Sequence, residues 1–411
     1  MASVTIRSAE PGEERRVTAV DVAAFSARIP EAVLDATLPL FAADRMLVAE
    51  DGDDGFVGSA ASFPFALTVP GGSVVRAGGV TAVGVLPTHR RRGVLRALMA
   101  AQLDDLAGRG EAVALLTASE SGIYRRFGYG VATHAAEVEI DPAHTALLAE
   151  PAAGGRVRLV DGEAAVARLG AAHDAVAAVR PGTIGRDAAW WTAVLAEPES
   201  FVGGGSPFAL VHEDDHGAPD GYALYRATSR WDDDGLPAGT LHVGELVATT
   251  PEVEAELLAR VCRVDLMDRI RVWRPVDDWW RHRLVEPRQL RTRRIIDHLW
   301  ARILDVPAAL TARRYAWSGA LVLDVVDPFR PAMSSRVRLE VGADGAARCA
   351  GTDEAPDLVL DVADLGSIWL GGVPVGRLVA AGLVREMRPG AATAAEACFA
   401  WSPTPWCLSR F

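Results

Sequence analysis

The residues best suited to chemistry lie between Gly79 and Arg96, where an apolar run gives way to a basic turn and then to a helical pattern. A β-branched strand is predicted to stop at Pro87, and apolar residues at helical spacing begin at Val94. Backbone N–H groups at such a junction, with the positive end of the helix dipole behind them, form a cradle for phosphate groups. Gly93 would let a phosphate approach the backbone closely. We therefore predict a pyrophosphate site, against the alternative of a basic surface turn that merely starts a helix.

A second candidate segment, Ala118–Gly130, contains the polar pair Ser119 and Glu120 and a tyrosine, Tyr124. A phenol can act as a general acid. The residues by themselves favour a different interpretation, in which Tyr124 is a core aromatic on a short helix beside Phe127.

Composition limits the classes of function. The chain has 411 residues, half of them hydrophobic, which predicts a globular protein of two or three domains. A net charge of −12 argues against nucleic acid as the main partner and fits a cationic small substrate better. We find no membrane or targeting segment, and therefore expect a cytoplasmic protein with no membrane partner.

Cysteine spacing and the acidic residues give no sign of a metal site. None of the four cysteines forms a C-x-x-C pair, so buried or reduced thiols are expected. The run Asp232–Asp234 lacks the glycine and the spacing of a calcium loop, and we interpret it as a solvated loop. We expect no metal.

Turn residues divide the chain into three blocks, which we predict to be domains at 1–150, 151–295 and 296–411. A Gly- and Pro-containing stretch, Glu150–Gly155, is expected to link the first two. The middle block is predicted to begin with a helix at Ala164–Val179, followed by three strands at Phe208–His212, Tyr222–Arg226 and Leu241–Thr249. A second helix at Pro251–Asp268 and a last strand at Arg271–Pro275 should complete it. This order loosely resembles that of the first block and indicates a degenerate internal duplication.

The third block is expected to open with an amphipathic helix near Asp297, whose apolar face would carry Ile296, Leu299, Trp300, Ile303 and Leu304. Four strands should follow, at Ala320–Val326, Ser335–Val341, Ala347–Ala350 and Leu358–Val362. Two helices should come after them, at Ala363–Leu370 and Val375–Ala381. We predict a small α+β domain with an antiparallel sheet, and a mixed α+β class for the whole chain.

Longer motifs point to a known family. The run Arg90–Leu95 is similar to the R-x-x-G-x-[GA] signature of the GCN5-related N-acetyltransferases, with Leu95 where glycine or alanine is usual. The run Val85–Arg96 closely resembles the A-P-T-H-R-R-R-G-L-L-R version of the enhanced intracellular survival (Eis) family, in which leucine at that position is familiar. Ala118–Gly130 looks like the same family's A-S-E-x-x-I-Y-x-R-F-G-Y-G run. Shorter matches occur at Gly221–Arg226, Val306–Leu310, Leu365–Gly371 and the terminal Phe411.

The resemblance implies a fold, an activity and a class of partner. The family has an N-terminal acetyltransferase domain that binds acetyl-coenzyme A, a second acetyltransferase-like domain without a donor site, and a C-terminal domain like sterol carrier proteins. The middle block lacks an R-x-x-G-x-[GA] turn, so one coenzyme A site per chain is expected. The implied acceptors are primary amines of polycations such as aminoglycosides, with lysine side chains of peptides or proteins as an alternative, and the implied assembly is a homohexamer.

Roles for individual residues also follow from the resemblance. Backbone groups of Val83, Gly84 and Val85 would hold the pantetheine arm and the thioester, with Ser119 and Glu120 near the donor. The residues expected to hold the pyrophosphate are Arg91, Arg92, Gly93, Val94, Leu95 and Arg96. Tyr124 would be the proton donor to the leaving thiolate, and the terminal carboxylate on Phe411 would be the proton acceptor.

An α-carboxyl has a reference pKa of about 3.3–3.7, which makes it a poor base in water. Burial among aromatic residues, or an adjacent carboxylate, would raise that pKa. The residue before Phe411 is Arg410, where a member of the family has glutamate, and this departure bears on affinity for cationic substrates more than on the chemistry. Two alternatives stay open. The first concerns the tail: last residues are usually frayed, but three aromatics and two prolines among the final eleven residues favour a docked tail. The second is that the protein is a non-catalytic acyl-coenzyme A or lipid-binding scaffold.

Overall fold

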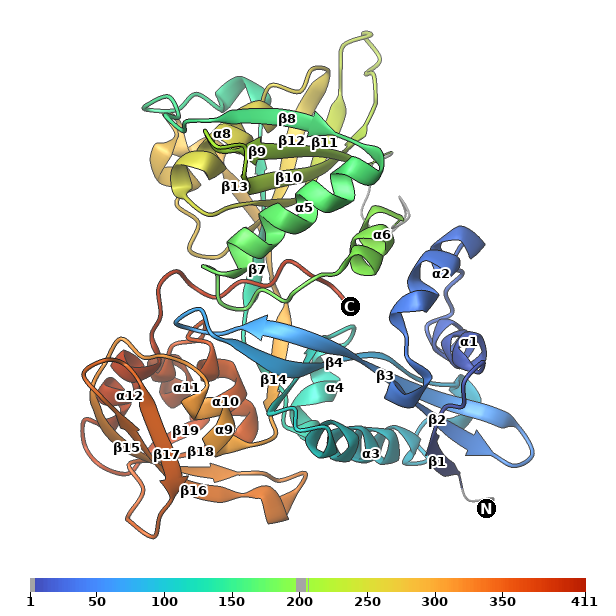
Figure 1. Cartoon of the computed structure of the whole chain (residues 1–411), viewed down its shortest axis with the longest axis vertical. Helices are drawn as coiled ribbons and strands as arrows, with labels where there is room; N and C mark the ends of the chain where they lie inside the picture. The colour runs from blue at the N-terminus through green and yellow to red at the C-terminus, as the bar shows by residue number, and fades with distance from the viewer. Residues whose placement is uncertain (1–3, 197–204, 206) are drawn as a thin grey trace. The chain divides into compact units, whose positions relative to one another are not determined.

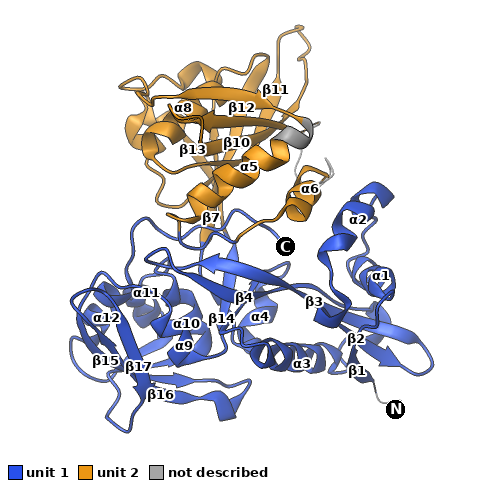
Figure 2. Ribbon diagram, in the orientation of Figure 1, with its two compact units in different colours: residues 1–133, 181–184, 297–411 blue, residues 134–180, 185–296 orange. Residues whose placement is uncertain are grey.

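The computed structural model describes residues 4–196, 205 and 207–411, and these fall into two compact units (Figure 2). Unit 1 comprises residues 1–133, 181–184 and 297–411, and unit 2 comprises residues 134–180 and 185–296. Each unit contains a seven-stranded sheet, and unit 1 contains a further five-stranded sheet. The candidate site residues all belong to unit 1.

The first sheet of unit 1 has the order β1-β2-β3-β4-β5-β14-β6 (Figure 1). Its strands are β1 Thr5–Ser8, β2 Met46–Asp51, β3 Gly55–Thr68, β4 Val74–Val85, β5 Val113–Thr117, β14 Leu299–Ile303 and β6 Gly130–Val131. The helices are α1 Glu14–Ala24, α2 Glu31–Thr37, α3 Val94–Gly108 and the short α4 Ser121–Tyr124.

Helices α1 and α3 cover opposite faces of this sheet. Alternate residues of a strand point to opposite faces, and β2 divides accordingly. Met46 and Val48 pack with the α1 residues Val17 and Val20. Leu47 and Ala49 pack with the α3 residues Val94 and Leu98.

The helix predicted over 296–304 is wrong: β13 Arg291–Asp297 and β14 Leu299–Ile303 occupy this segment. All five residues of β14 are buried, because the strand lies between β5 and β6 within the sheet. A strand covered on both faces has no apolar–polar alternation. A charged residue in a helical pattern normally marks the solvent-facing side. Arg302 does not, because its guanidinium is buried in an ion pair with Asp327.

The C-terminal part of unit 1 has a sheet of order β17-β16-β15-β18-β19. Its elements are α9 Val306–Thr311, β15 Gly319–Val326, β16 Ser335–Val341, β17 Ala347–Gly351, β18 Leu358–Asp361, α10 Val362–Trp369, α11 Val375–Ala380, β19 Val384–Glu386 and α12 Ala391–Phe399. The predicted strands and helices are confirmed, but the sheet is not wholly antiparallel because β15 and β18 pair in parallel. Helix α10 approaches the first sheet closely at two glycines. A Cβ on Gly130 would lie 1.8 Å from Ala363 O, and one on Gly366 would lie 2.2 Å from Ala301 O.

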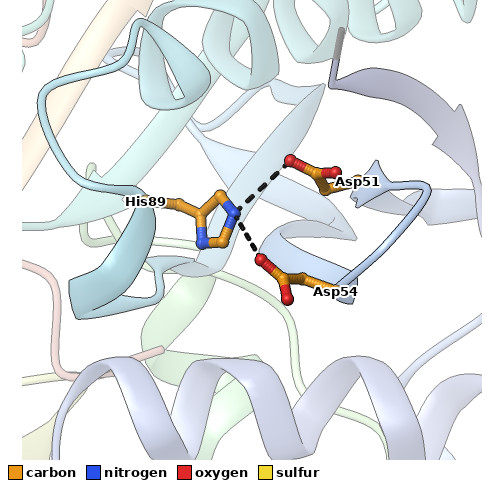
Figure 3. A group of neighbouring side chains, drawn as sticks. All are labelled: Asp51, Asp54 and His89. Carbon is orange, nitrogen blue, oxygen red and sulfur yellow. Dashed lines mark ion pairs between the residues drawn. The ribbon is translucent and has the colours of Figure 1, made fainter. Parts of the chain in front are cut away.

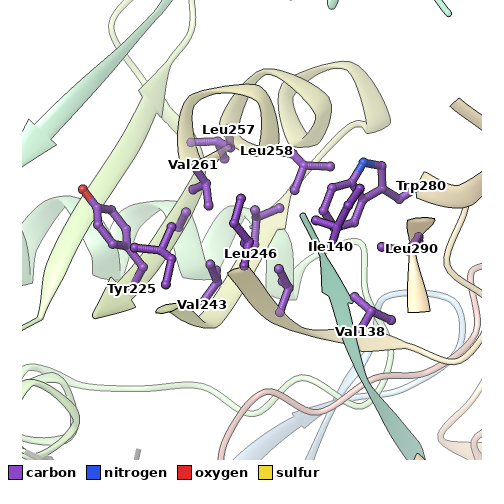
Figure 4. Close-up of a cluster of buried hydrophobic side chains, with 14 of the residues drawn as sticks. Val138, Ile140, Tyr225, Val243, Leu246, Leu257, Leu258, Val261, Trp280 and Leu290 are labelled. Carbon is purple, nitrogen blue, oxygen red and sulfur yellow. The ribbon is translucent and has the colours of Figure 1, made fainter. Parts of the chain in front are cut away.

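Unit 2 has a sheet of order β13-β7-β12-β11-β10-β9-β8. Its elements are β7 His134–Ile140, β8 Arg156–Val160, α5 Gly162–Ala177, α6 Ala188–Ala196, β9 Phe208–Glu213, β10 Pro219–Thr228, β11 Gly239–Ala248, α8 Pro251–Val261, β12 Met267–Pro275 and β13. The strands predicted here are confirmed, and the helix predicted to run to Asp268 ends at Val261. One face of α8 packs Leu257, Leu258 and Val261 into the core shown in Figure 4. Across the described ranges of the whole chain, no helix has the length and apolar character needed to cross a bilayer.

Candidate active site

A wedge opens between strands β4 and β5 in unit 1. The two strands pair in parallel only where Ala77–Gly79 meets Val113–Leu115. Beyond Gly79, β4 pairs with β3 alone and β5 pairs with β14 in the described sheet. Beyond Gly79, the backbone N–H and C=O groups of β4 that face β5 can therefore pair with a ligand that lies in the wedge.

A β-bulge lies in β4 at the mouth of the wedge. The pairing with β3 shifts between Ser59↔Gly84 and Ala61↔Thr81, so that β4 contains one extra residue there. Ala82 takes a positive φ of 48°, and the Ser59 hydroxyl donates to its carbonyl oxygen at 3.0 Å. Val83, Gly84 and Val85 are predicted to contact the pantetheine arm; Val83 lies within this bulge, and Gly84 and Val85 follow it.

The predicted pyrophosphate turn follows β4. Pro87–His89 form a single 3₁₀ turn, Arg91 and Gly93 have φ values of 62° and 86°, and α3 begins at Val94. Gly93 is the N-cap, so no side chain caps the first turn of α3, and that turn carries no acidic residue. Its N–H groups and the positive end of the dipole are thus available to an anion.

His89 fixes this turn to the loop between β2 and β3 (Figure 3). Its ring is buried, with Nε2 at 3.5 Å from Asp51 Oδ2 and 3.3 Å from Asp54 Oδ2, and with Nδ1 at 2.8 Å from Thr88 Oγ1. Arg92 Nη2 lies 3.5 Å from the same Asp51 oxygen. The ligand atoms of the histidine and both aspartates lie within 4.8 Å of one another. Because the Arg92 cation already faces Asp51, we interpret the group as an ion-pair network that holds the turn.

We expect His89→Phe to weaken acetyl-coenzyme A binding roughly threefold to tenfold. The variant keeps an aromatic ring in the buried position but loses both ion pairs, so the turn would be ordered only on binding, at a cost of about 1 kcal/mol. Calorimetry measures the affinity. The control is Asp53→Asn, an exposed neighbour outside the network. Equal affinities for His89→Phe and wild type would mean that the network does not position the turn.

The other predicted phosphate contacts lie along the same turn. Arg91, Arg92 and Arg96 are exposed. The Arg96 guanidinium stacks over the ring of Phe329 at 4.9 Å, which restricts its direction. Val94 is buried against the sheet and Leu95 packs in the core beneath the wedge, so these two can offer only backbone groups to a ligand.

Tyr124 lies at the base of the wedge, in a core cluster that also holds Val80 and Tyr129. Its side chain is 6% exposed, and its ring meets that of Tyr129 edge to face at 6.1 Å. Burial raises the pKa of the phenol; a hydrogen bond with Ser119 lowers it in part, and the charges of Asp21 and Glu120 raise it further. The phenol therefore stays protonated at neutral pH, as a proton donor must. Ser119 and Glu120 are both exposed, directly after β5.

The C-terminus is docked in unit 1. Thr117, at the end of β5, donates its hydroxyl to the Phe411 carboxyl oxygen at 2.7 Å, and the Phe411 N–H reaches the same hydroxyl at 3.4 Å. The Phe411 ring meets Phe65 of β3 edge to face at 4.7 Å. Of the two open interpretations of the tail, the docked one is correct. Thr117 is a residue that sequence reasoning missed, because its partner lies 294 positions away.

Asp21 of α1 is a second residue missed from the sequence. A Cβ on Gly84 would lie 3.4 Å from Asp21 Oδ1, which places this carboxylate beside the β4 bulge. Oδ1 is buried and has no hydrogen-bond partner among the described residues. Burial raises the pKa of Asp21 to about 6.

Unit 2 contains the same strand–helix junction in another form. The N-terminus of α8 is capped by Thr250, which accepts from Val253 N–H at 3.3 Å, and its first turn carries Glu252 and Glu254. The buried Arg274 guanidinium donates to Leu246 O at 3.2 Å and pairs with Glu254. A capped, acidic helix start repels a pyrophosphate.

Comparisons with known proteins agree with one another and cover most of the chain. Models of the GNAT acetyltransferase domain match residues 5–132 and 182–303, and a sterol carrier protein domain matches 306–408. An uncharacterized N-acetyltransferase of Streptomyces avermitilis is 42% identical over 357 residues, which cover 85% of this chain and 84% of that protein. The N-acetyltransferase Eis of Mycobacterium tuberculosis is 37% identical over 353 residues, 83% of each chain. The crystal structure of Eis1 from Mycobacterium abscessus superposes over 99% of this chain and 100% of that chain, with a TM-score of 0.85 and 36% identity. The predicted fold, two acetyltransferase domains and a sterol-carrier-like domain, is confirmed.

Proposed function

Since this chain belongs to the Eis family of GNAT N-acetyltransferases, we propose that it transfers an acetyl group directly from acetyl-coenzyme A to a primary amine of a polycationic acceptor. Aminoglycosides are the acceptor class we favour, and lysine side chains of basic peptides are the alternative. The observation that carries the proposal is the convergence of the open helix start, the β4–β5 wedge, Tyr124 and the chain terminus within unit 1.

The donor would lie along β4. The pyrophosphate binds the N–H groups at the start of α3 and the exposed arginines of the turn, and the pantetheine arm pairs with the backbone from Val83 to Val85. This places the thioester near the β4 bulge, on the side where Tyr124 is buried. Because the corresponding helix start in unit 2 is capped and acidic, one donor site per chain is expected.

The transfer needs a neutral amine, a tetrahedral intermediate and a protonated leaving group. The amine nitrogen attacks the thioester carbonyl carbon, and the carbon–sulfur bond then breaks. Tyr124 gives its phenol proton to the departing thiolate, while the Phe411 carboxylate takes the proton from the attacking nitrogen. The products are an N-acetyl amide and the free thiol of coenzyme A, and solvent returns the proton from carboxylic acid to phenolate.

Thr117 supports the role given to Phe411. Its hydroxyl holds the terminal carboxylate at the end of β5, the strand that forms one side of the wedge. A positioned carboxylate loses little entropy in the transition state. The family also leads us to propose a homohexameric assembly, which light scattering of the purified protein would measure.

We expect Gly93→Val to weaken acetyl-coenzyme A binding by at least tenfold. Gly93 has a φ of 86°, which a β-branched residue adopts only under strain, and the added side chain would stand where the pyrophosphate approaches. Isothermal titration calorimetry measures the affinity and the stoichiometry, which should be one donor per chain in the wild type.

Gly12→Val is the matched control. Gly12 also has a positive φ, of 94°, and an added Cβ meets nothing within 4 Å there, as at Gly93. Both variants therefore carry a similar backbone cost, and only Gly93→Val should lose donor affinity. Two donors per chain, or equal affinity in both variants, would show that the motif has been assigned wrongly.

Coenzyme A release against a panel of aminoglycosides, polyamines and basic peptides tests the function itself. Release that depends on an added amine supports transfer. Binding of acetyl-coenzyme A without amine-dependent release from any member of the panel would favour a non-catalytic scaffold.

A further inference from the structure

The carboxylate of Asp21 lies beside Gly84 of β4, and its Oδ1 has no hydrogen-bond partner among the described residues. Asp21 belongs to α1, which packs against β3 and β4 on the face opposite α3 (Figure 1). Beside Gly84, a Cβ would lie 2.8 Å from Ala24 Cβ, 3.3 Å from Asp21 Cα and 3.4 Å from Asp21 Oδ1. The carboxylate is thus next to the stretch of β4 expected to hold the thioester.

Keeping an unpaired carboxylate oxygen away from water costs stability. The oxygen Oδ1 is fully covered, and no described donor reaches it. Buried polar groups left without a partner are uncommon in native proteins and call for an explanation. Because Asp21 as a whole is only half-buried, a positively charged ligand group that pairs with its carboxylate is one explanation that also fits the neighbourhood.

The charged and titratable groups around Asp21 leave room for such a cation. On α1, one turn beyond Asp21, the Ala24 carbonyl accepts from Arg90 Nη2 at 3.0 Å. That guanidinium is therefore directed at the helix end, and no ion pair between it and Asp21 is present. Tyr124, on α4 after β5, is close enough for the negative charge of Asp21 to raise the pKa of its phenol, and the phenol is neutral. Neither group neutralises the carboxylate.

We propose that Asp21 binds the ammonium group of the acceptor and places it at the β4 bulge, which makes it a substrate-binding residue specific for cationic amines. The proposal deepens and rests on the proposed function. The role proposed for Asp21 adds an anion to a site in which Arg410, the residue before the terminal carboxylate, is a cation. The bound ammonium gives up one proton to solvent to become the neutral nucleophile, and the terminal carboxylate then takes the second proton from the attacking nitrogen.

The first test compares Asp21→Asn with wild type in coenzyme A release. Loss of a charge-assisted hydrogen bond to the acceptor should raise KM for the amine roughly 10- to 100-fold, with kcat changed by less than about threefold. The donor affinity should be unchanged, because the pyrophosphate turn is separate. Asp21→Glu should restore part of the affinity. Asp105→Asn, which removes the same charge from the far end of α3, is the control and should match wild type.

Stability supplies a readout independent of activity. Removing an unpaired buried carboxylate should raise Tm, so Asp21→Asn is expected to melt above wild type at pH 7. The folded-state pKa of Asp21 is raised to about 6, whereas an unfolded aspartate titrates near 3.9. The folded state therefore binds the proton more tightly, and the penalty appears as pH rises from about 4 to 6. The Tm advantage of the variant should disappear below about pH 4.

Each outcome decides between explanations. A fall in kcat with unchanged KM would make Asp21 the proton acceptor and overturn the binding role. Unchanged KM and kcat would overturn any role in the acceptor site. If wild type itself releases no coenzyme A with any amine, the proposed function fails first, and the inference about Asp21 fails with it.

Discussion

Replacing Tyr124 by phenylalanine should lower kcat about 10²–10⁴-fold, the usual contribution of a general acid. The ring stays in place and keeps its packing against Tyr129, so the fold and the donor affinity should not change. What is lost is the only hydroxyl proton that we assign to the leaving thiolate. Steady-state kinetics at saturating donor and amine measure the effect on turnover directly.

Tyr129→Phe is the matched control for this variant. Tyr129 belongs to the same core cluster, is completely buried, and its hydroxyl oxygen has no hydrogen-bond partner among the described residues. Its removal should leave turnover near wild type and should not reduce Tm. Equal turnover in Tyr124→Phe and wild type would return Tyr124 to a packing role, and equal losses in both variants would indicate disturbed packing instead of lost acid catalysis.

Extending the chain beyond Phe411 should nearly abolish turnover. An added residue converts the terminal carboxylate into a neutral amide, which cannot accept a proton, while every side chain stays present. Donor binding should persist, because the pyrophosphate turn and its His89 anchor are built from another part of the chain. Comparing N-tagged with C-tagged protein in coenzyme A release, with calorimetry for the donor, separates the two properties.

Two further variants refine this result. Deleting Phe411 moves the carboxylate about 3.3–3.6 Å back along an extended chain and removes the ring that packs on Phe65. Even a 1 Å misplacement can cost about 10²-fold, so turnover should fall. Thr117→Val keeps the terminus but loses the hydroxyl that donates to it, and a smaller fall is expected. Comparable turnover in C-tagged and N-tagged protein would exclude the terminal carboxylate as the base.

Local features of this fold could be predicted from the sequence. The strand that ends before Pro87, the basic turn and the helix from Val94 all follow from neighbouring residues, through β-branching, proline and the spacing of apolar side chains. The strands of unit 2 and of the C-terminal sheet were predicted for the same reason. The boundary that differs is the end of α8, which lies at Val261 instead of Asp268.

Features that depend on distant residues could not be predicted. The segment 299–303 becomes a strand because β5 and β6 pair with its two edges, and its own pattern suits a helix equally well. Thr117 has no motif, and only its contact with the chain end reveals it. Asp21 sits in an ordinary amphipathic helix, and nothing in α1 indicates that β4 approaches it at a bulge. The resemblance to a family supplied the role of Phe411, which no residue pattern indicates.

Every residue role proposed above depends on one activity, the transfer of an acetyl group from acetyl-coenzyme A to an amine. Mass spectrometry of an aminoglycoside incubated with acetyl-coenzyme A and the N-tagged protein, read together with coenzyme A release, tests it directly. We predict an acceptor heavier by one or more acetyl groups, with one coenzyme A released for each, and no product when the donor is omitted. An unmodified acceptor across aminoglycosides, polyamines and basic peptides, with acetyl-coenzyme A bound but intact, would contradict it.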